Sequence, residues 1–234
     1  MRFAWHYYRV TLFYLAITVA SYALYHYLQH LPEASGVMSA GSLWQQKGSV
    51  TDGLRSVWLI FAWGFGVQAL IQVVRVFERK PRDANLPDLL RHGAYLSAHA
   101  GLFEEIVFRL YAFLSFIIIL HYLNDHVWGG LQSLATGVIL PAANWLTLGV
   151  FHGQFNAANW ALGLAVIIGS LFFRSAHVHY GYLSKLNVWI IGLVMFWLTL
   201  NYGLITAIIA HFLYDFCVFA AIALTAPLQP RAVE

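Results

Sequence analysis

The amino-acid sequence predicts an all-α fold: a polytopic integral membrane bundle of about seven transmembrane helices, with six to eight as the bounds. Of its 234 residues, 60% are hydrophobic and 10% are charged, and the mean hydropathy is +0.66. A soluble domain of this size needs more polar surface. Several apolar runs also reach the roughly 20 residues that cross a bilayer, and they do not alternate as barrel strands do.

Each expected span is a continuous apolar run between polar connections. The segment 188–200 is short for a full crossing, and Tyr202-Gly203 predicts a tight turn before the last span. The polar stretches 30–54 and 78–93 are predicted to be loops. The seven expected spans are residues 10–28, 57–74, 95–120, 130–151, 156–173, 188–200 and 204–226.

The basic residues predict the orientation. Placing the N-terminus in the cytosol puts the basic cluster of residues 75–91 inside, as the positive-inside rule favours. The net charge of +3 comes from short loops beside spans and forms no basic stripe, so we expect no nucleic-acid partner. The N-terminus lacks a signal-peptide pattern and is read as a retained span. We therefore expect a multi-pass protein. The short single-domain chain, without an organellar targeting pattern, favours a bacterial inner membrane.

Two carboxylates and a guanidinium stand inside the third span, in the stretch EEIVFRL. Ionisable groups at this depth cost about 2.5–3.5 kcal/mol each, so their presence suggests function. Glu105 and Arg109 are four residues apart and can pair on one helical face. Glu104 is turned about 100° from Glu105 and needs a partner on another helix.

Three further groups could meet Glu104 in an interior cavity. His152 ends the fourth expected span, and His211 and Asp215 share a face of the last one. The expected topology allows Glu104, His152 and His211 to lie in the cytosolic half of the membrane. A carboxylate beside imidazoles can activate water, and His211 with Asp215 could support an oxyanion. This combination is suited to peptide hydrolysis.

These residues form three ordered motifs that resemble the CAAX-protease and bacteriocin-processing family (CPBP or ABI) of intramembrane endopeptidases. E-E-x-x-x-R is met in full by Glu104, Glu105 and Arg109. F-x-x-x-H is half met by Leu148 and His152. H-x-x-x-N/D is met by His211 and Asp215. The resemblance covers residues 102–216 and leaves out the first two expected spans.

The resemblance implies a role for each motif. Glu104 with His152 would activate the attacking water, and His211 with Asp215 would support the oxyanion. Glu105 and Arg109 would hold the architecture of the site. It also implies a membrane-associated peptide or protein substrate. From the spans and loops together we expect a single domain, with two N-terminal helices in 1–92 and a catalytic core in 93–227.

The metal requirement stays open at this point. Glu104, His152 and His211 could supply three zinc ligands and leave one position open. No H-E-x-x-H motif is present, however, and we favour a glutamate mechanism that requires no cofactor.

Two other classes are alternatives. A haem-binding electron-transfer protein could use paired histidines, with His99, His121, His152 and His211 as candidates, but would not explain two buried glutamates. A proton-coupled transporter could use the same acidic groups, but no internal repeat is present. His177 and His179 form an H-x-H pair in a predicted outer loop, where we expect no role.

Overall fold

The structure, a computed structural model, describes residue 43 and residues 45–76, 86–177 and 182–225; for 72–76 and 225 it describes the backbone alone. The described residues form helices and turns, with no strand among them, and the predicted all-α fold is confirmed. The expected first span, 10–28, lies outside the described residues.

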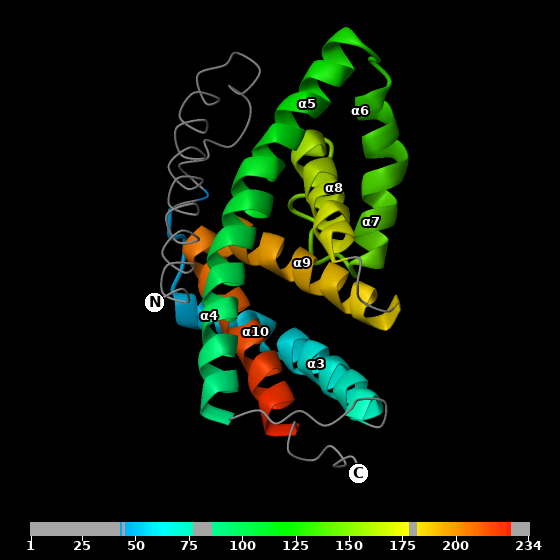
Figure 1. Ribbon diagram of the computed structural model, residues 1–234. Coiled ribbons are helices and arrows are strands. Elements are labelled where there is room, and N and C mark those ends of the chain that lie inside the picture. The colour runs from blue at the N-terminus through cyan, green and yellow to red at the C-terminus, as the bar shows by residue number, and fades with distance from the viewer. Residues whose placement is uncertain (1–42, 44, 77–85, 178–181, 226–234) are drawn as a thin grey trace. The chain divides into compact units, whose positions relative to one another are not determined.

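Ten helical segments follow one another along the described chain (Figure 1). Two of them, η2 and η3, are wider π-helical stretches. The segments are α3 (Val50–Val76), α4 (Leu86–Glu104), η2 (Glu105–Ala112), α5 (Phe113–His126), α6 (Leu131–Leu134), η3 (Ala135–Ile139), α7 (Leu140–Leu146), α8 (Trp160–Ala176), α9 (Tyr182–Tyr202) and α10 (Leu204–Thr225).

Four helical stretches are long and apolar enough to cross a membrane: Val50–Ile71, Leu86–His126, Tyr182–Tyr202 and Leu204–Leu224. They correspond to the second, third, sixth and seventh expected spans. The sixth is longer than predicted and reaches 21 residues. The fifth expected span corresponds to the shorter helix α8.

The fourth expected span, 130–151, is not one helix. Its helical part consists of α6, η3 and α7 and ends at Leu146. Leu148 and Gly149 then adopt positive φ angles of 53° and 77°, which end a right-handed helix. Residues 147–159 form turns.

Both predicted loops end earlier than expected, since helices begin inside them. In α3, the Ser49 hydroxyl accepts a hydrogen bond from the Asp52 N–H (3.0 Å) and donates one to the Asp52 carboxylate (2.7 Å). The Ser49 hydroxyl thus caps the helix N-terminus, at a position that the sequence marks as S-x-x-D. In α4, Pro87 and Asp88 occupy the first turn, where proline and an acidic side chain are both favoured.

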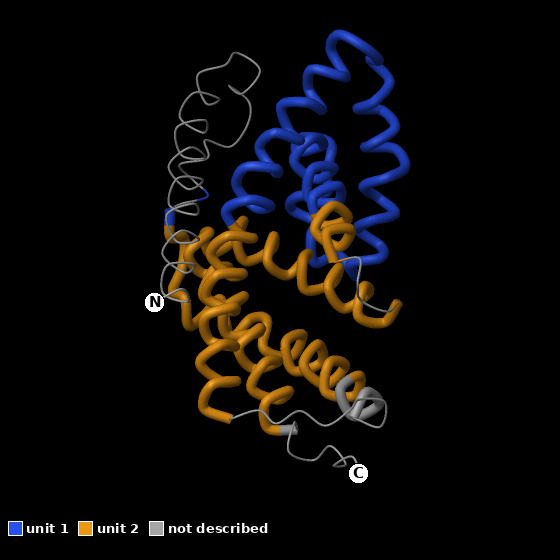
Figure 2. The backbone as a smooth tube through the Cα atoms, viewed as in Figure 1, with its two compact units in different colours: residues 1–45, 106–169 blue, residues 46–105, 170–234 orange. Residues whose placement is uncertain are grey.

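The chain forms two compact units (Figure 2). Of the described residues, the first unit contains 43, 45 and 106–169, and the second contains 46–76, 86–105, 170–177 and 182–225. Within the first, α6 packs against α5 and η3, and η3 packs against α7. Within the second, α10 packs against α3, α4 and α9. Figure 1 shows α10 between α4 and α3.

An apolar core holds α3, α9 and α10 together. Met195 and Leu198 of α9 and Ala207 and Ala210 of α10 are fully buried, so little apolar surface of this cluster remains exposed. Small side chains on α10 let the larger ones of α9 fill the space between the helices. The remaining buried members are Val57, Ile191, Val194 and Tyr214.

The predicted turn at Tyr202-Gly203 is confirmed. Gly203 has a φ of 102°, and its N–H lies 3.1 Å from the carbonyls of Leu198 and Thr199, which ends α9. Lys47 secures the turn, because its ammonium donates to the Leu200 carbonyl at 2.8 Å.

Small residues let α4 and α10 approach closely. Gly93, Ser97 and Gly101 are buried and recur at every fourth position of α4. A Cβ atom at Gly101 would lie 3.0 Å from the Phe212 backbone nitrogen and 3.1 Å from the Ile208 carbonyl oxygen. Close backbone contact through small residues is a common way for membrane helices to associate. The next position in this row is Glu105.

We predict that Gly101→Leu destabilises the protein by about 1–3 kcal/mol, because the side chain meets backbone atoms that cannot rotate away. Thermal unfolding in detergent measures the effect. Gly66→Leu is the matched control, since a Cβ atom at Gly66 meets nothing within 4 Å. Equal unfolding temperatures for the two variants would contradict the close approach of α4 and α10.

Candidate active site

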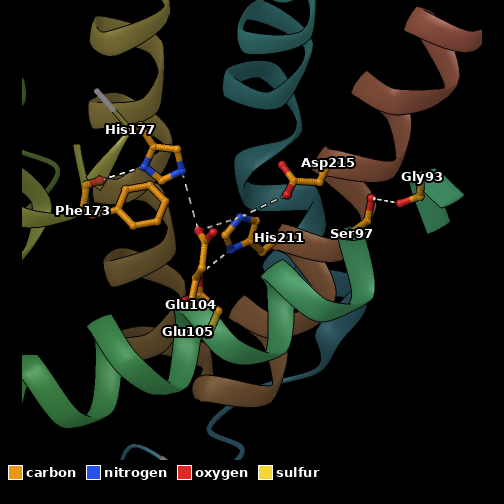
Figure 3. A network of polar contacts seen from close by, with 8 residues as sticks. All are labelled: Gly93, Ser97, Glu104, Glu105, Phe173, His177, His211 and Asp215. Atoms are coloured by element: carbon orange, nitrogen blue, oxygen red, sulfur yellow. Dashed lines mark hydrogen bonds and ion pairs between the residues drawn. The ribbon is translucent and has the colours of Figure 1, made fainter. Parts of the chain in front are cut away.

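The polar groups of the second unit gather where α4 meets α10. Glu104 ends α4 and Glu105 follows it directly. His211 and Asp215 lie one turn apart on α10, and His177 follows the last residue of α8. Figure 3 shows these five side chains together, with the Glu104 carboxylate between the two imidazoles.

A buried hydrogen bond joins Glu105 to His211. Glu105 Oε1 lies 2.7 Å from His211 Nδ1, and the two side chains are 0% and 4% exposed. An ionised carboxylate can only accept, so Nδ1 carries the proton. The ring is thereby held with Nε2 directed away from Glu105. This pairing adds a partner that the sequence had not suggested for Glu105.

Glu104 faces two imidazole nitrogens. Its Oε2 atom lies 3.8 Å from His211 Nε2 and 3.9 Å from His177 Nε2. Both distances exceed that of a direct hydrogen bond and match polar groups that share a water molecule. The Glu104 side chain is also less buried than that of Glu105. The two adjacent glutamates therefore have different surroundings.

His177 is oriented by its own helix. Its Nδ1–H donates to the Phe173 carbonyl at 2.8 Å, since a carbonyl oxygen can only accept. The Phe173 ring packs against His177, with centroids 4.7 Å apart, and meets the His211 ring edge-on at 6.1 Å. One aromatic side chain thus supports both imidazoles, and Nε2 of His177 is the nitrogen that faces Glu104.

Asp215 completes the cluster from α10. Its Oδ2 atom lies 3.5 Å from His211 Nε2, as the spacing of four residues predicted. His211 therefore has carboxylates from Glu104, Glu105 and Asp215 around its ring.

Two of the predicted site residues belong to the first unit. Arg109 is fully buried in η2, and its guanidinium carbon lies 6.0 Å from the centroid of the Phe108 ring. His152 is exposed in the turns after α7. His152 therefore belongs to a different compact unit from the cluster of Glu104, His177 and His211.

Sequence reasoning missed His177, although a signal was present. Phe173 and His177 match F-x-x-x-H in full, whereas the predicted motif at Leu148 and His152 is only half met. Leu148 is 92% exposed and Phe173 is 3% exposed. His177 lies in a turn after α8, as a loop residue would, but its place beside Glu104 corrects the expectation that it lies apart from the candidate site residues.

The same distance corrects part of the expected topology. Glu104 was assigned to the cytosolic half of the membrane and His177 to an outer loop. Two atoms 3.9 Å apart lie at nearly the same depth, so these two assignments do not hold together.

A cavity of about 320 Å³ opens beside the cluster, within the second unit. Glu104, His177, His211 and Asp215 line one part of it. Apolar side chains of α4, α9 and α10, including Leu96, Ile191, Val218 and Ile222, line much of the rest. An apolar wall with a few polar groups is typical of a ligand-binding cavity.

The family model of type II CAAX prenyl endopeptidases, Rce1-like, matches residues 87–217, more than half of the chain. The chain belongs to this family. No curated protein and no solved structure matches the chain. Membership confirms the predicted resemblance and indicates an integral membrane endopeptidase that acts on a peptide or protein substrate. It favours a hydrolase over the haem-protein and transporter alternatives.

The donor distances in this CAAX-family site are longer than those of a tetrahedral zinc site. Two ligands at about 2.0–2.1 Å from a tetrahedral zinc stand about 3.4 Å apart. The His177 and His211 nitrogens are each 3.8–3.9 Å from Glu104 Oε2. Among the residues that the structure describes, no group of three or more His, Cys, Asp or Glu has a metal-binding arrangement. We therefore derive no step through a metal.

We predict that Glu105→Leu destabilises this CAAX-family protein by about 3–5 kcal/mol, because His211 loses its buried partner. Thermal unfolding in detergent measures the loss. Glu105→Gln is the comparison variant, since an amide oxygen of the same size can still accept from His211 Nδ1. It should lose clearly less stability; an equal loss in both variants would contradict the hydrogen bond's role in holding the ring.

Proposed function

We propose that the protein hydrolyses a peptide bond of a membrane-associated protein or peptide, with Glu104 as the general base. The observation that carries this proposal is the position of Glu104 Oε2, 3.8 and 3.9 Å from two imidazole nitrogens. A water molecule held between such groups has its proton acceptor beside it before the substrate arrives.

The first step uses Glu104 and His177. Water donates one proton to Glu104 and keeps its other hydrogen directed at His177 Nε2, which accepts because Nδ1 holds the ring proton. The water oxygen attacks the substrate carbonyl carbon, and the C=O electron pair moves onto the carbonyl oxygen. His177 thus takes the part that the sequence analysis gave to His152.

The second step uses His211 and Asp215. An imidazolium at His211 donates Nδ1–H to Glu105 and keeps Nε2–H for the negative oxygen of the tetrahedral intermediate. Asp215, 3.5 Å from Nε2, favours this charge on the ring. Glu104 then gives its proton to the leaving amine as the C–N bond breaks. Glu105 acts through His211 and is a positioning residue.

Arg109 supports the architecture in this proposal and touches no reacting atom. Its full burial in η2, a few residues after the two glutamates, agrees with that assignment. We also propose that the N-terminus lies in the cytosol, based on the basic cluster at residues 75–91, and that the membrane is the inner membrane of a bacterium, as expected from the short single-domain chain.

We predict that Glu104→Gln lowers the cleavage rate by about 10²–10⁴-fold, because an amide cannot take the proton of water. Peptide-terminus profiling compares membranes from cells that contain the wild type or the variant at equal abundance. Termini that occur with the wild type alone identify both the activity and the substrate. Identical termini, with the wild-type protein folded and present, would contradict the proposed function.

We predict that His177→Ala lowers the cleavage rate at least about tenfold more than His152→Ala does, because His177 faces Glu104. The rate is measured on the substrate that profiling identifies. Equal accumulation in membranes controls for misfolding. A larger loss of cleavage rate in the His152 variant would contradict the role of His177 and would support the motif at Leu148 and His152.

A further inference from the structure

A buried polar pair lies in the wall of the active-site cavity and is not used by the proposed mechanism. Asn187 of α9 donates from Nδ2 to the Tyr214 hydroxyl of α10 at 2.8 Å. Both residues line the same cavity as Glu104 and His211. Asn187 is 1% exposed and Tyr214 is 8% exposed, so neither side chain is directed to bulk solvent.

The carbonyl oxygen of Asn187 is buried and has no hydrogen-bond partner among the described residues. Such an acceptor in apolar surroundings costs free energy that folding does not recover. An apolar side chain at this position of α9 would avoid the cost. The unpaired oxygen therefore suggests a donor that arrives with a ligand.

The pair offers one acceptor and one donor to such a ligand. Asn187 Oδ1 can accept, and the Tyr214 hydroxyl, which already accepts from Asn187, still has its own proton to donate. An N–H and a C=O are the two groups that every peptide unit carries. The polar pair therefore matches the main chain of a peptide and does not depend on a particular side chain.

The polar pair lies in the same cavity wall as the proposed catalytic residues. Tyr214 directly precedes Asp215 and lies three residues after His211, on the face of α10 that borders the cavity. Gly64 of α3 lies behind the pair, where an added Cβ atom would come within 3.0 Å of both Asn187 Oδ1 and the Tyr214 hydroxyl. The absence of a side chain at Gly64 leaves room for the pair in its present position.

We propose that Asn187 and Tyr214 bind the main chain of the substrate beside the scissile bond. Asn187 Oδ1 accepts a substrate N–H, and the Tyr214 hydroxyl donates to a substrate C=O. This inference rests on the proposed function, since it names how that same site holds its peptide. It assigns the pair to binding, so its loss affects the capture of substrate more than the chemical step.

The test compares Asn187→Leu, Tyr214→Phe and the double variant with the wild type. The probe is an internally quenched peptide that spans the cleavage site found by terminus profiling. Each single variant should raise KM about five- to twentyfold and leave kcat within about twofold. The double variant should unfold at the wild-type temperature or above it, because it removes a buried unpaired oxygen.

A matched pair of glycine variants tests the position of the site. Gly64→Ala places a methyl group against the polar pair and should also raise KM. Gly66→Ala, two residues along α3, meets nothing within 4 Å and should leave KM unchanged.

A modified probe tests the hydrogen bond itself. Replacing one amide of the peptide by an ester removes an N–H. When the replaced N–H is the one that donates to Asn187 Oδ1, the wild type should bind the ester probe more weakly than the amide probe. The same ester should cause no further loss in Asn187→Leu.

The outcomes separate this inference from the proposed function. No cleavage of the probe by the wild type would overturn both. Cleavage by the wild type with an unchanged KM in both single variants would overturn the inference alone. So would a double variant that unfolds at a lower temperature with wild-type KM, because the pair would then be structural.

Discussion

The close approach of α4 and α10 is the constraint on which the rest of the site depends. Gly93, Ser97 and Gly101 bring the two backbones together, and Glu105 follows them in the same row. The approach allows Glu105 to reach His211 at 2.7 Å in a buried position. A larger side chain at any of these positions would increase the separation and break a hydrogen bond that fixes the ring.

The two adjacent glutamates have different surroundings because a helix turns by about 100° per residue. Glu105 faces α10 and accepts the buried hydrogen bond from His211. Glu104 faces the cavity and two imidazole nitrogens. One carboxylate orients and the other reacts in the proposed mechanism. In that mechanism, the apolar side chains that line much of the cavity limit the solvent that competes with the attacking water molecule.

Much of this could be predicted from the sequence, for reasons tied to particular residues. Apolar runs identified four of the long helices, and the spacing of His211 and Asp215 placed them on one face. The place of His177 in the site was not predicted, because its motif crosses the end of α8, where the polar residues indicated a loop. The break at Leu148 depends on positive φ angles that an apolar run does not reveal. The Glu105–His211 bond links residues 106 positions apart, which no local pattern encodes.

The row that ends at Glu105 also restricts how the length of the chain can change. A residue deleted between Gly101 and Glu104 would turn the helix so that Ile106 replaces Glu105 opposite His211. An inserted residue would instead bring Glu104 to that position and remove the reactive carboxylate from the cavity. Neither error can be repaired by moving a loop, because the register is set by helix geometry. The number of residues between Gly101 and Glu105 is therefore fixed by the same geometry that brings Glu105 to His211.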